Sequence, residues 1–361
     1  MENTPTEAPR EDRLAVVLGR KHLPGLDAIR AVAAFLVVYY HAGAPFVSGG
    51  MGVLAFFVLS GFLITWLLLA EQEKYGGISF RLFYIRRSLR IFPAFYCYFL
   101  LLTGLLWITA KRIVWPQAAA SFFYVNNYWQ AWNGDPNTGL SHTWSLGIEE
   151  QFYLLWPVGL VWLERRGWTW RALTLLVPAL WLLRLTLKFG FDVPQSYIYS
   201  ALETRADHLL TGALLAVALR RCYWRPLWAR LIAHPALPLL TLAALAGSMA
   251  AGNVYGHLYR DSAGFILDPL LVAVWIVQWM ALGGTGLWSL VEHPAVRYLG
   301  QISYSIYLYQ QIVPDSVRKL WPAATGLPRI AAVTVLVLAL ASLSYWVIER
   351  PFLRWKDRFS R

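Results

Sequence analysis

A guanidinium and an imidazole lie eleven residues apart in an apolar stretch, LPGLDAIRAVAAFLVVYYHAG, at residues 23–43. In a helix this spacing is three turns plus about 20°, so Arg30 and His41 share one face and lie ~16 Å apart along the axis. Charged side chains within a bilayer cost roughly 2.5–3.5 kcal/mol on insertion scales, which makes such residues candidates for function. A neutral imidazole can accept a proton from a hydroxyl that attacks an acyl carbonyl. The alternative is a packed or interfacial histidine without a chemical role.

Two adjacent carboxylates follow a second histidine in the segment HTWSLGIEEQFYLLWP, residues 142–157. Glu149 and Glu150 point to different faces of a helix, so at most one of them can face His41. A carboxylate beside an imidazole fixes its tautomer and stabilises the imidazolium. The alternative is a structural ion pair between one of these glutamates and an arginine of a later span, Arg184 or Arg205.

Three arginines are grouped in the segment RLFYIRRSLRIFPAF, residues 81–95, on a predicted helix that ends near Pro93. Arg90 lies three residues after Arg87 and four after Arg86, so it is a helix-surface neighbour of both. Clustered guanidinium groups bind phosphates in a bidentate manner. Cytosolic loops of membrane proteins are also rich in arginine without any ligand, and this alternative stays open.

The elements that must position these residues are membrane-spanning helices. Of the 361 residues, 58% are apolar and only 14% are charged, whereas soluble domains carry about 25% charged residues. Apolar runs of about 20 residues can cross the hydrocarbon core, and within it each span must be a helix. The sequence therefore predicts an all-α polytopic bundle of about ten transmembrane helices, near residues 28–46, 52–70, 91–110, 147–163, 172–189, 205–219, 231–251, 263–282, 299–317 and 329–348.

The distribution of basic residues predicts the orientation of these spans. With the N-terminus in the cytosol, the inside segments hold 22 of the 32 Lys and Arg residues and the outside segments hold seven. Because cytosolic loops carry the excess of positive charge, we expect both termini in the cytosol. We expect a tail at 1–24, a ten-helix domain at 25–350 and a basic tail at 351–361, with no appended soluble domain. The +12 net charge is thus explained by topology, without a nucleic-acid partner.

The longest outside segment, 111–146, is aromatic and polar, with the sequence SFFYVNNYWQAWNGDPNTGLSHTW at its end. Long loops in compact proteins are usually functional or disordered, and this one is too aromatic for disorder. We expect it to fold over the outer mouth of the bundle. Its side chains suited to an acceptor are Asn126, Asn127, Tyr128, Trp129 and Trp144, the asparagines as candidate oxyanion donors and the aromatic rings as stacking surfaces for sugars.

The remaining ionisable groups favour structural roles. Glu203, Arg205, Asp207 and His208 begin the sixth predicted span, and we expect them to pair among themselves. The two cysteines, Cys97 and Cys222, have neither disulfide nor metal-ligand spacing, and we expect no metal.

Taken together, the motifs resemble those of the acyltransferase-3 family of membrane O-acyltransferases over nearly the whole chain. Seven segments occur in the family's order, and no single one of them is specific. They are LPGLDAIRAVAAFLVVYYHA, GVLAFFVLSGFLIT, RRSLRIFPAFY, HTWSLGIEEQFYLLWP, TRADHLLTGALLA, LGQISYSIYLYQ and WVIERPF.

The resemblance implies a ten-helix enzyme of the bacterial cytoplasmic membrane. Such an enzyme moves an acyl group, often acetyl, from cytosolic acyl-CoA to a hydroxyl of a carbohydrate or glycolipid acceptor outside. By position, His41 matches the family's catalytic histidine, Arg30 its partner arginine, and Glu149 the acidic residue after Trp-Ser-Leu. Arg87 and Arg90 match the arginine pair used for the donor, with Arg86 beside them.

The chain departs from the family after SYSIYLY, where many members have a histidine and this chain has Gln310 and Gln311. We therefore assign no catalytic histidine there. Two other functions stay open: a multi-pass transporter, since carriers also use intramembrane Arg, Glu and His, and acylation of a macrolide-type small molecule. Carriers usually show paired repeats with broken helices, and the sequence contains no such repeat.

Overall fold

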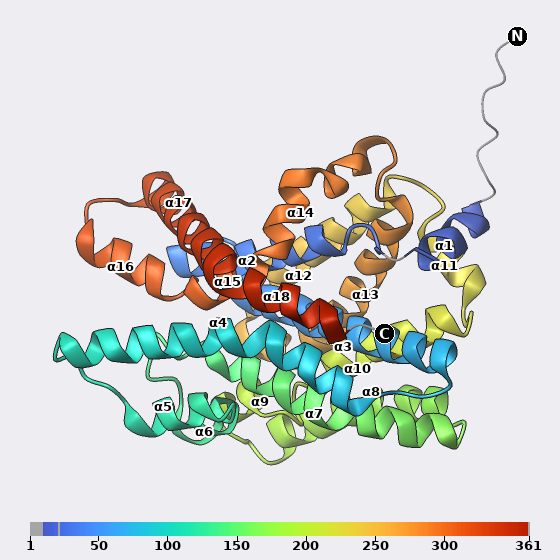
Figure 1. Ribbon diagram of the computed structural model, residues 1–361, viewed down its shortest axis with the longest axis horizontal. Coiled ribbons are helices and arrows are strands. Elements are labelled where there is room, and N and C mark those ends of the chain that lie inside the picture. Colours follow the sequence, from blue (N-terminus) through green and yellow to red (C-terminus); the bar gives the residue numbers. More distant parts are fainter. Residues whose placement is uncertain (1–9, 21, 360–361) are drawn as a thin grey trace, which may run out of the picture.

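The computed structural model describes residues 10–20 and 22–359, and every regular element in that part of the chain is helical (Figure 1). Nine helices of 15 to 29 residues form the body of the bundle. These are α2 (Leu26–Ala42), α3 (Gly49–Tyr75), α4 (Phe80–Ile108), α7 (Thr143–Arg165), α8 (Thr169–Leu185), α10 (Ala206–Arg220), α12 (Leu237–Tyr259), α13 (Phe265–Leu282) and α17 (Gly326–Ser344).

Shorter helices connect and cover the long ones. They are α1 (Arg10–Leu18), α5 (Trp115–Phe122), α6 (Asn126–Asn133), α9 (Gln195–Ser200), α11 (Arg225–Leu231), α14 (Pro294–Gln301), α15 (Ser303–Tyr309), α16 (Ile312–Leu320) and α18 (Arg350–Lys356). Three π-helical turns follow or precede long helices, namely η1 (Thr186–Gly190), η2 (Arg260–Gly264) and η4 (Tyr345–Glu349), and two 3-10 turns are η3 (Gly286–Glu292) and η5 (Asp357–Phe359).

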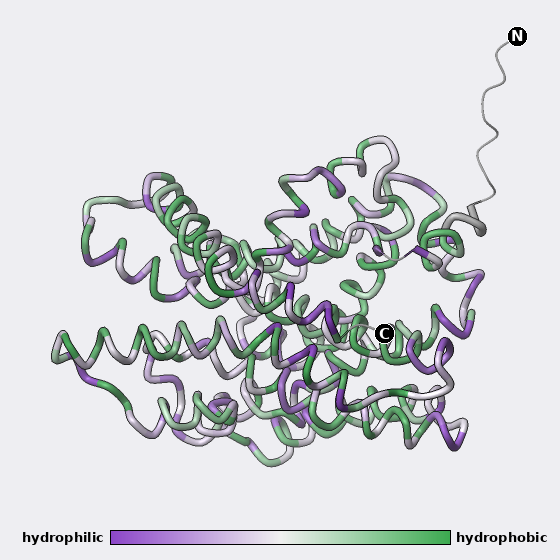
Figure 2. Tube along the Cα trace, viewed as in Figure 1, coloured by the Kyte–Doolittle hydropathy of each residue, from purple (hydrophilic) through white to green (hydrophobic). Residues whose placement is uncertain are grey.

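Five helical segments of the described residues are long and apolar enough to cross a membrane. They are Gly49–Tyr75, Phe80–Ile108, Thr169–Gly190, Leu237–Leu282 and Gly326–Phe359. Figure 2 shows their tubes as largely hydrophobic, with the polar colours concentrated in the turns and near the centre of the molecule. The predicted all-helical membrane class is therefore confirmed, whereas the number of ten spans and the side of the termini stay predictions.

The outside of the bundle carries many apolar side chains, and helices that cross a membrane explain them. Leu100, Leu101, Trp107 and Ile108 of α4 are all more than half exposed. An apolar face of this extent is unfavourable in water and favourable against lipid. α4 therefore presents one side to the bilayer and the other, with Phe95 and Tyr98 buried, to the bundle.

Two sequence predictions about helix boundaries are wrong. The first placed a helix end near Pro93, but α4 continues through this proline to Ile108. Proline is tolerated within helices that are packed in a membrane bundle, because neighbouring elements can satisfy the freed backbone groups. The carbonyl oxygen that loses its helical donor at Pro93 is that of Leu89, and the adjoining turn is bonded to α15, since the hydroxyl of Tyr304 donates to the carbonyl oxygen of Ile91 at 3.1 Å.

The second correction concerns the predicted span at 299–317, which is not one helix. The chain forms α14, α15 and α16 in turn, with breaks at Ile302 and at Gln310–Gln311. Both glutamine side chains are buried, and Gln311 accepts a hydrogen bond from the backbone N–H of His142 at 3.2 Å. The break thus lies where a glutamine bonds to a distant segment of the chain. Hydropathy does not report such contacts, so it could not predict the break.

The centre of the bundle is α3, which packs against α2 on one side and α10 on another. The helices α3 and α10 cross at two glycines, where a Cβ atom on Gly61 would lie 1.8 Å from the carbonyl oxygen of Leu209. A Cβ atom on Gly212 would lie 1.9 Å from the carbonyl oxygen of Val58. Small residues at a crossing allow backbones to approach closely and gain dispersion contacts.

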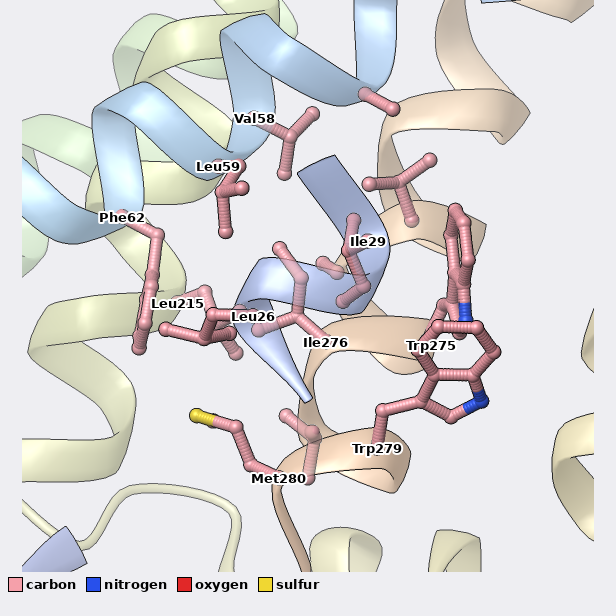
Figure 3. Packing of buried hydrophobic residues seen from close by; sticks show 14 of the residues in the cluster. Leu26, Ile29, Val58, Leu59, Phe62, Leu215, Trp275, Ile276, Trp279 and Met280 are labelled. Atoms are coloured by element: carbon pink, nitrogen blue, oxygen red, sulfur yellow. The ribbon is translucent and has the colours of Figure 1, made fainter. Parts of the chain in front are cut away.

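The buried cluster beside this crossing joins four helices. Figure 3 shows Ile29 of α2, Val58 and Phe62 of α3, and Trp275 of α13 pointing into one space, together with Leu215 of α10. Because these helices are held by one core, the polar side chains on their other faces are held at fixed positions.

Candidate active site

A cavity of about 550 Å³ lies between α2, α3, α4, α7 and α15, and α18 and η5 border it. One part of its wall is basic and belongs to the N-terminal half of α4 and the C-terminal end of α3. The rest is apolar, with Phe56, Phe57, Leu63 and Ile64 of α3 on one side. A cavity with an apolar body and a few polar groups is the usual form of a small-molecule site.

The three arginines predicted from the sequence all line this cavity. Arg86 forms an ion pair with Glu71 at 2.9 Å and donates to the carbonyl oxygen of Phe359 at 3.1 Å. Arg87 lies over the ring of Tyr153, 3.6 Å from its centroid. Guanidinium groups that line an open cavity are available to a phosphate-bearing ligand.

Glu149 and Arg30 line the same cavity. The Glu149 carboxylate accepts a hydrogen bond from the hydroxyl of Ser60 at 2.7 Å, and the charges of Arg87 and Arg30 act on it. Arg30 also lies 3.4 Å from Asp27, one turn earlier on α2. The structure therefore brings Arg30, Arg87 and Glu149 together around one space.

His41 lies on the same regular helix as Arg30, eleven residues further on, and is absent from the residues that line the cavity. Its ring packs edge-on against Tyr40, with centroids 5.2 Å apart, and the side chain is half-buried. The charges that act on it come from Asp315, Asp135 and Arg318. The structure thus gives His41 two carboxylate neighbours other than Glu149, which is held by Ser60 instead.

Ser145 and Tyr307 form a further part of the cavity wall, which we call its inner end, and their hydroxyl oxygens lie 2.5 Å apart. Behind this pair lies His142, whose carbonyl oxygen accepts from the Tyr307 hydroxyl at 3.3 Å. The His142 imidazole lies between the rings of Tyr98 and Tyr307, at centroid distances of 5.5 and 5.6 Å. Burial, and secondly the neighbouring His41, lower the pKa of His142 to about 3, so this imidazole is neutral near pH 7.

The 111–146 segment folds into α5 and α6 and packs on α7 and α9. Its two predicted oxyanion donors are fully buried and already bonded. The Asn126 amide donates to the hydroxyl of Thr143 at 2.8 Å, and the amides of Asn127 and Gln151 bond to each other at 2.8 and 3.2 Å. These asparagines hold the loop to α7.

The aromatic residues of this segment differ in exposure. Trp144 is buried against Phe57 and Tyr199, so its faces are covered. Tyr128 and Trp129 are half-buried, and Tyr128 stacks on Trp132, which is 72% exposed. Burial, together with the 2.9 Å hydrogen bond to Glu203, raises the pKa of Tyr128, so its hydroxyl stays protonated.

The charged group at the start of α10 is a buried structural cluster. Arg184 and Asp207 are fully buried and form an ion pair at 2.9 Å, and the carboxylate lies 3.8 Å from His208. Arg205 has no hydrogen-bonding partner for its guanidinium and lies among four aromatic rings, the nearest being Phe265 at 4.1 Å. Asp207 thus pairs with an arginine of α8 in addition to its own segment.

Sequence reasoning missed Ser60, Tyr307 and Lys356, which all line the cavity. Tyr307 belongs to the recognised segment 299–310, so its motif was a usable signal. Lys356 could not be found from the sequence, because basic residues are common in cytosolic tails and need no ligand there. Among the described residues, no group of three His, Cys, Asp or Glu side chains could hold a metal ion.

Comparison with known proteins gives one family match and several similar relatives. A family model described as Acyltransferase domain matches residues 23–346. The peptidoglycan O-acetyltransferase OatA of Listeria monocytogenes is 30% identical over 364 residues, which is 92% of this chain and 56% of that protein. YrhL of Bacillus subtilis, provisionally named as a peptidoglycan O-acetyltransferase, is 31% identical over 92% of this chain and 55% of its own length.

A protein of Staphylococcus aureus strain MRSA252, provisionally named as an O-acetyltransferase, is 28% identical over 94% of this chain and 60% of that protein. The chain therefore spans somewhat more than half the length of these curated relatives. No solved structure matches the chain.

Proposed function

This chain belongs to the acyltransferase family whose domain model it matches, and from that membership we propose that it transfers an acyl group, in the first instance acetyl, from cytosolic acyl-CoA to a carbohydrate hydroxyl outside the cytoplasmic membrane. The observation that carries this proposal is the cavity with arginines at one end and an apolar body that reaches Ser145 and Tyr307. Peptidoglycan-type glycans are the acceptors to test first, since two relatives are named for that polymer.

The charged and apolar parts of an acyl-CoA donor match the basic and apolar parts of the cavity wall. Coenzyme A carries a 5′-diphosphate and a 3′-phosphate at its nucleotide end and a thioester at the end of an extended arm. The phosphates would bind Arg86, Arg87 and Arg90 through charge-assisted hydrogen bonds. The arm would lie along the apolar wall of α3, so the thioester would point to the inner end of the cavity.

His41 is proposed as the general base. Its imidazole nitrogen accepts the proton of the acceptor hydroxyl while that oxygen attacks the thioester carbonyl carbon. The tetrahedral intermediate then collapses, the C–S bond breaks, and the leaving thiolate takes up the proton that the His41 imidazolium gives back. Asp315 and Asp135, which act on His41, would stabilise the imidazolium that forms.

Glu149 takes a different part in this scheme from the one expected from sequence. Its neighbours are Ser60, Arg87 and Arg30. A carboxylate in this position would orient the guanidinium groups toward the donor, and we propose it as a positioning residue for donor binding. The acceptor would approach over Tyr128, Trp129 and Trp132, whose exposed faces suit stacking on sugar rings.

We propose that the acceptor hydroxyl and the donor thioester meet near Ser145 and Tyr307, since His41 does not itself line the cavity. The bonded hydroxyls line the cavity, and Tyr307 also donates to the carbonyl oxygen of His142, so this pair links the cavity wall to His142. We propose that the bond between the two hydroxyls opens during transfer. The closed pair would limit hydrolysis of the thioester when no acceptor is bound.

The test is release of free thiol from acetyl-CoA by the purified protein in vesicles, with and without a peptidoglycan-derived oligosaccharide on the opposite side. A transferase releases thiol only with acceptor present, and mass spectrometry finds an ester on the oligosaccharide. A multi-pass carrier, or an enzyme that modifies a macrolide-type molecule, gives neither result with this acceptor, and either outcome would reject the glycan proposal.

A further inference from the structure

The C-terminal helix borders the donor cavity, although it lies beyond the region that the family model matches, residues 23–346. Figure 1 shows α18, in red, lying along α4, and the two helices are in contact. The 3-10 turn η5 is tied to α4 by the hydrogen bond from Arg86 to the carbonyl oxygen of Phe359. Lys356, the last residue of α18, and Asp357 are part of the cavity wall.

Three positively charged side chains act on Lys356. From α4, the charges of Arg90, Arg86 and Arg87 all act on it, and from its own segment Asp357 acts with the opposite sign. From α3, Glu71 and Lys74 line the same part of the cavity, and the Glu71 carboxylate is engaged by Arg86 at 2.9 Å and by the backbone N–H of Ser79 at 2.9 Å.

Cations that converge on one opening repel each other, and the repulsion is strongest where the surroundings are partly desolvated. A multiply charged anion in the opening would turn this repulsion into attraction. The same residues would then give a site whose occupancy is sensitive to the number of phosphates on the ligand.

The depth of each group in the cavity decides which phosphate it meets. Along α4, Arg86 comes first and Arg90 one turn further into the bundle, where the charge of Arg30 acts on it. The donor's thioester must lie inward and its nucleotide outward. The diphosphate, next to the arm, would therefore meet Arg87 and Arg90, and the 3′-phosphate on the ribose would lie nearer the rim.

We infer that Lys356, held against α4 by the C-terminal helix, binds the 3′-phosphate of the acyl-CoA donor and so determines the specificity of this site for coenzyme A over donors that lack this phosphate. The inference rests on the proposed function. It adds a part of the chain outside the family domain to the donor site.

The experiment compares acetyl-CoA with acetyl-3′-dephospho-CoA in the thiol-release assay. We expect Lys356→Gln, which retains the stem, to raise the KM for acetyl-CoA about tenfold, the size of one lost charge-assisted hydrogen bond. The KM for the dephospho donor should change less than twofold, and kcat should be unchanged for both. Lys356→Arg should keep the wild-type preference between the two donors.

The matched control is Arg354→Gln, the same loss of one positive charge on the same helix, at an exposed side chain that does not line the cavity. It should behave as wild type with both donors. An equal rise in KM for both donors in Lys356→Gln, or no rise beyond that of Arg354→Gln, would overturn the inference. Failure of the proposed function is a different result: the wild-type protein would release no thiol from either donor.

Discussion

At the residue scale, His41 and Arg30 share a helix face but have different surroundings. Arg30 lies on the cavity wall beside Asp27, whereas His41 lies toward the other end of α2 near Asp315 and Asp135. A general base needs access to the acceptor more than to the donor, so this separation fits a residue that receives the acceptor's proton from outside.

Replacing His41 with Ala should lower kcat by about 10²-fold or more, because that is the usual contribution of a positioned general base. The assay is thiol release with saturating donor and acceptor. His257→Ala is the control, since His257 is an exposed histidine remote from the cavity wall. Turnover of a folded His41→Ala protein at the wild-type rate would exclude the proposed role.

Two carboxylate variants should separate catalysis from donor binding. Asp315→Asn should lower kcat and leave the donor's KM unchanged, since Asp315 acts on His41. Glu149→Gln should raise the donor's KM with a smaller effect on kcat, because Glu149 acts on Arg87 and Arg30. If Glu149→Gln lowered kcat alone and Asp315→Asn had no effect, the sequence-based pairing of Glu149 with His41 would be preferred.

His142 should make the protein less stable in acid. Its pKa is about 3 in the folded protein because of burial, against 6.5 when unfolded. The unfolded state therefore binds a proton below pH 6.5 that the folded state does not, and stability is lost as pH falls from 6.5 toward 3. The loss between pH 7 and pH 5 is about 2 kcal/mol. Thermal unfolding in detergent should show a smaller acid loss for His142→Gln, and an unchanged one for His257→Gln.

The sequence predicted the members of the site better than their partners. Arg30, Glu149 and the three arginines do line one cavity, because charge within an apolar span is itself a strong signal. The partners follow from tertiary packing, which places Ser60 of α3 beside Glu149 and Asp315 of α16 near His41. Asn126 and Asn127 were wrongly predicted as ligand-binding residues. Polar loop residues of either role look alike in a sequence, and only the structure shows that these two bond to Thr143 and Gln151.

At the scale of elements, the crossing of α3 and α10 should tolerate no side chain. Gly61→Ala or Gly212→Ala would place a Cβ within 2 Å of a backbone oxygen, which cannot move as a side chain can. Such overpacking should destabilise the protein by about 3 kcal/mol or more. Because α3 also carries the apolar wall of the cavity, we expect activity and thermal stability to fall together.

Gly104→Ala in α4 and Gly247→Ala in α12 are the matched controls, since nothing lies within 4 Å of a Cβ at either position. Both should be neutral or stabilising by up to about 1 kcal/mol, as alanine is the better helix former. Wild-type stability in Gly61→Ala would contradict the close crossing.

Hydropathy predicted the helices that are apolar along most of their length. The predicted spans at 52–70 and 205–219 correspond to α3 and α10. The predicted span at 299–317 failed because Gln310 and Gln311 are buried by contacts with other segments. The predicted helix end at Pro93 was wrong because a proline that would end a helix in water is tolerated in a helix packed within a membrane bundle.

At the scale of the molecule, α4 separates two ends with different chemistry. Its 29 residues extend about 43 Å, more than the hydrocarbon thickness. Arg86, near its beginning, is bonded to Phe359 of the C-terminal turn, and the 111–146 segment follows its other end. Arg86 and the C-terminal turn thus lie at one end of α4 and the 111–146 segment at the other, and we expect these two ends on opposite sides of the membrane.

This geometry makes the orientation testable with single cysteines in a background of Cys97→Ala and Cys222→Ala. A membrane-impermeant maleimide should label Asn133→Cys, on the exposed end of α6, in intact spheroplasts. It should label Arg354→Cys, on α18, only in inside-out vesicles. The expected result follows from the basic residues of the inside segments and from the need of a cytosolic donor for an opening on that side. Labelling of Arg354→Cys from outside would place the arginine cavity away from acyl-CoA and would reject the proposed donor site.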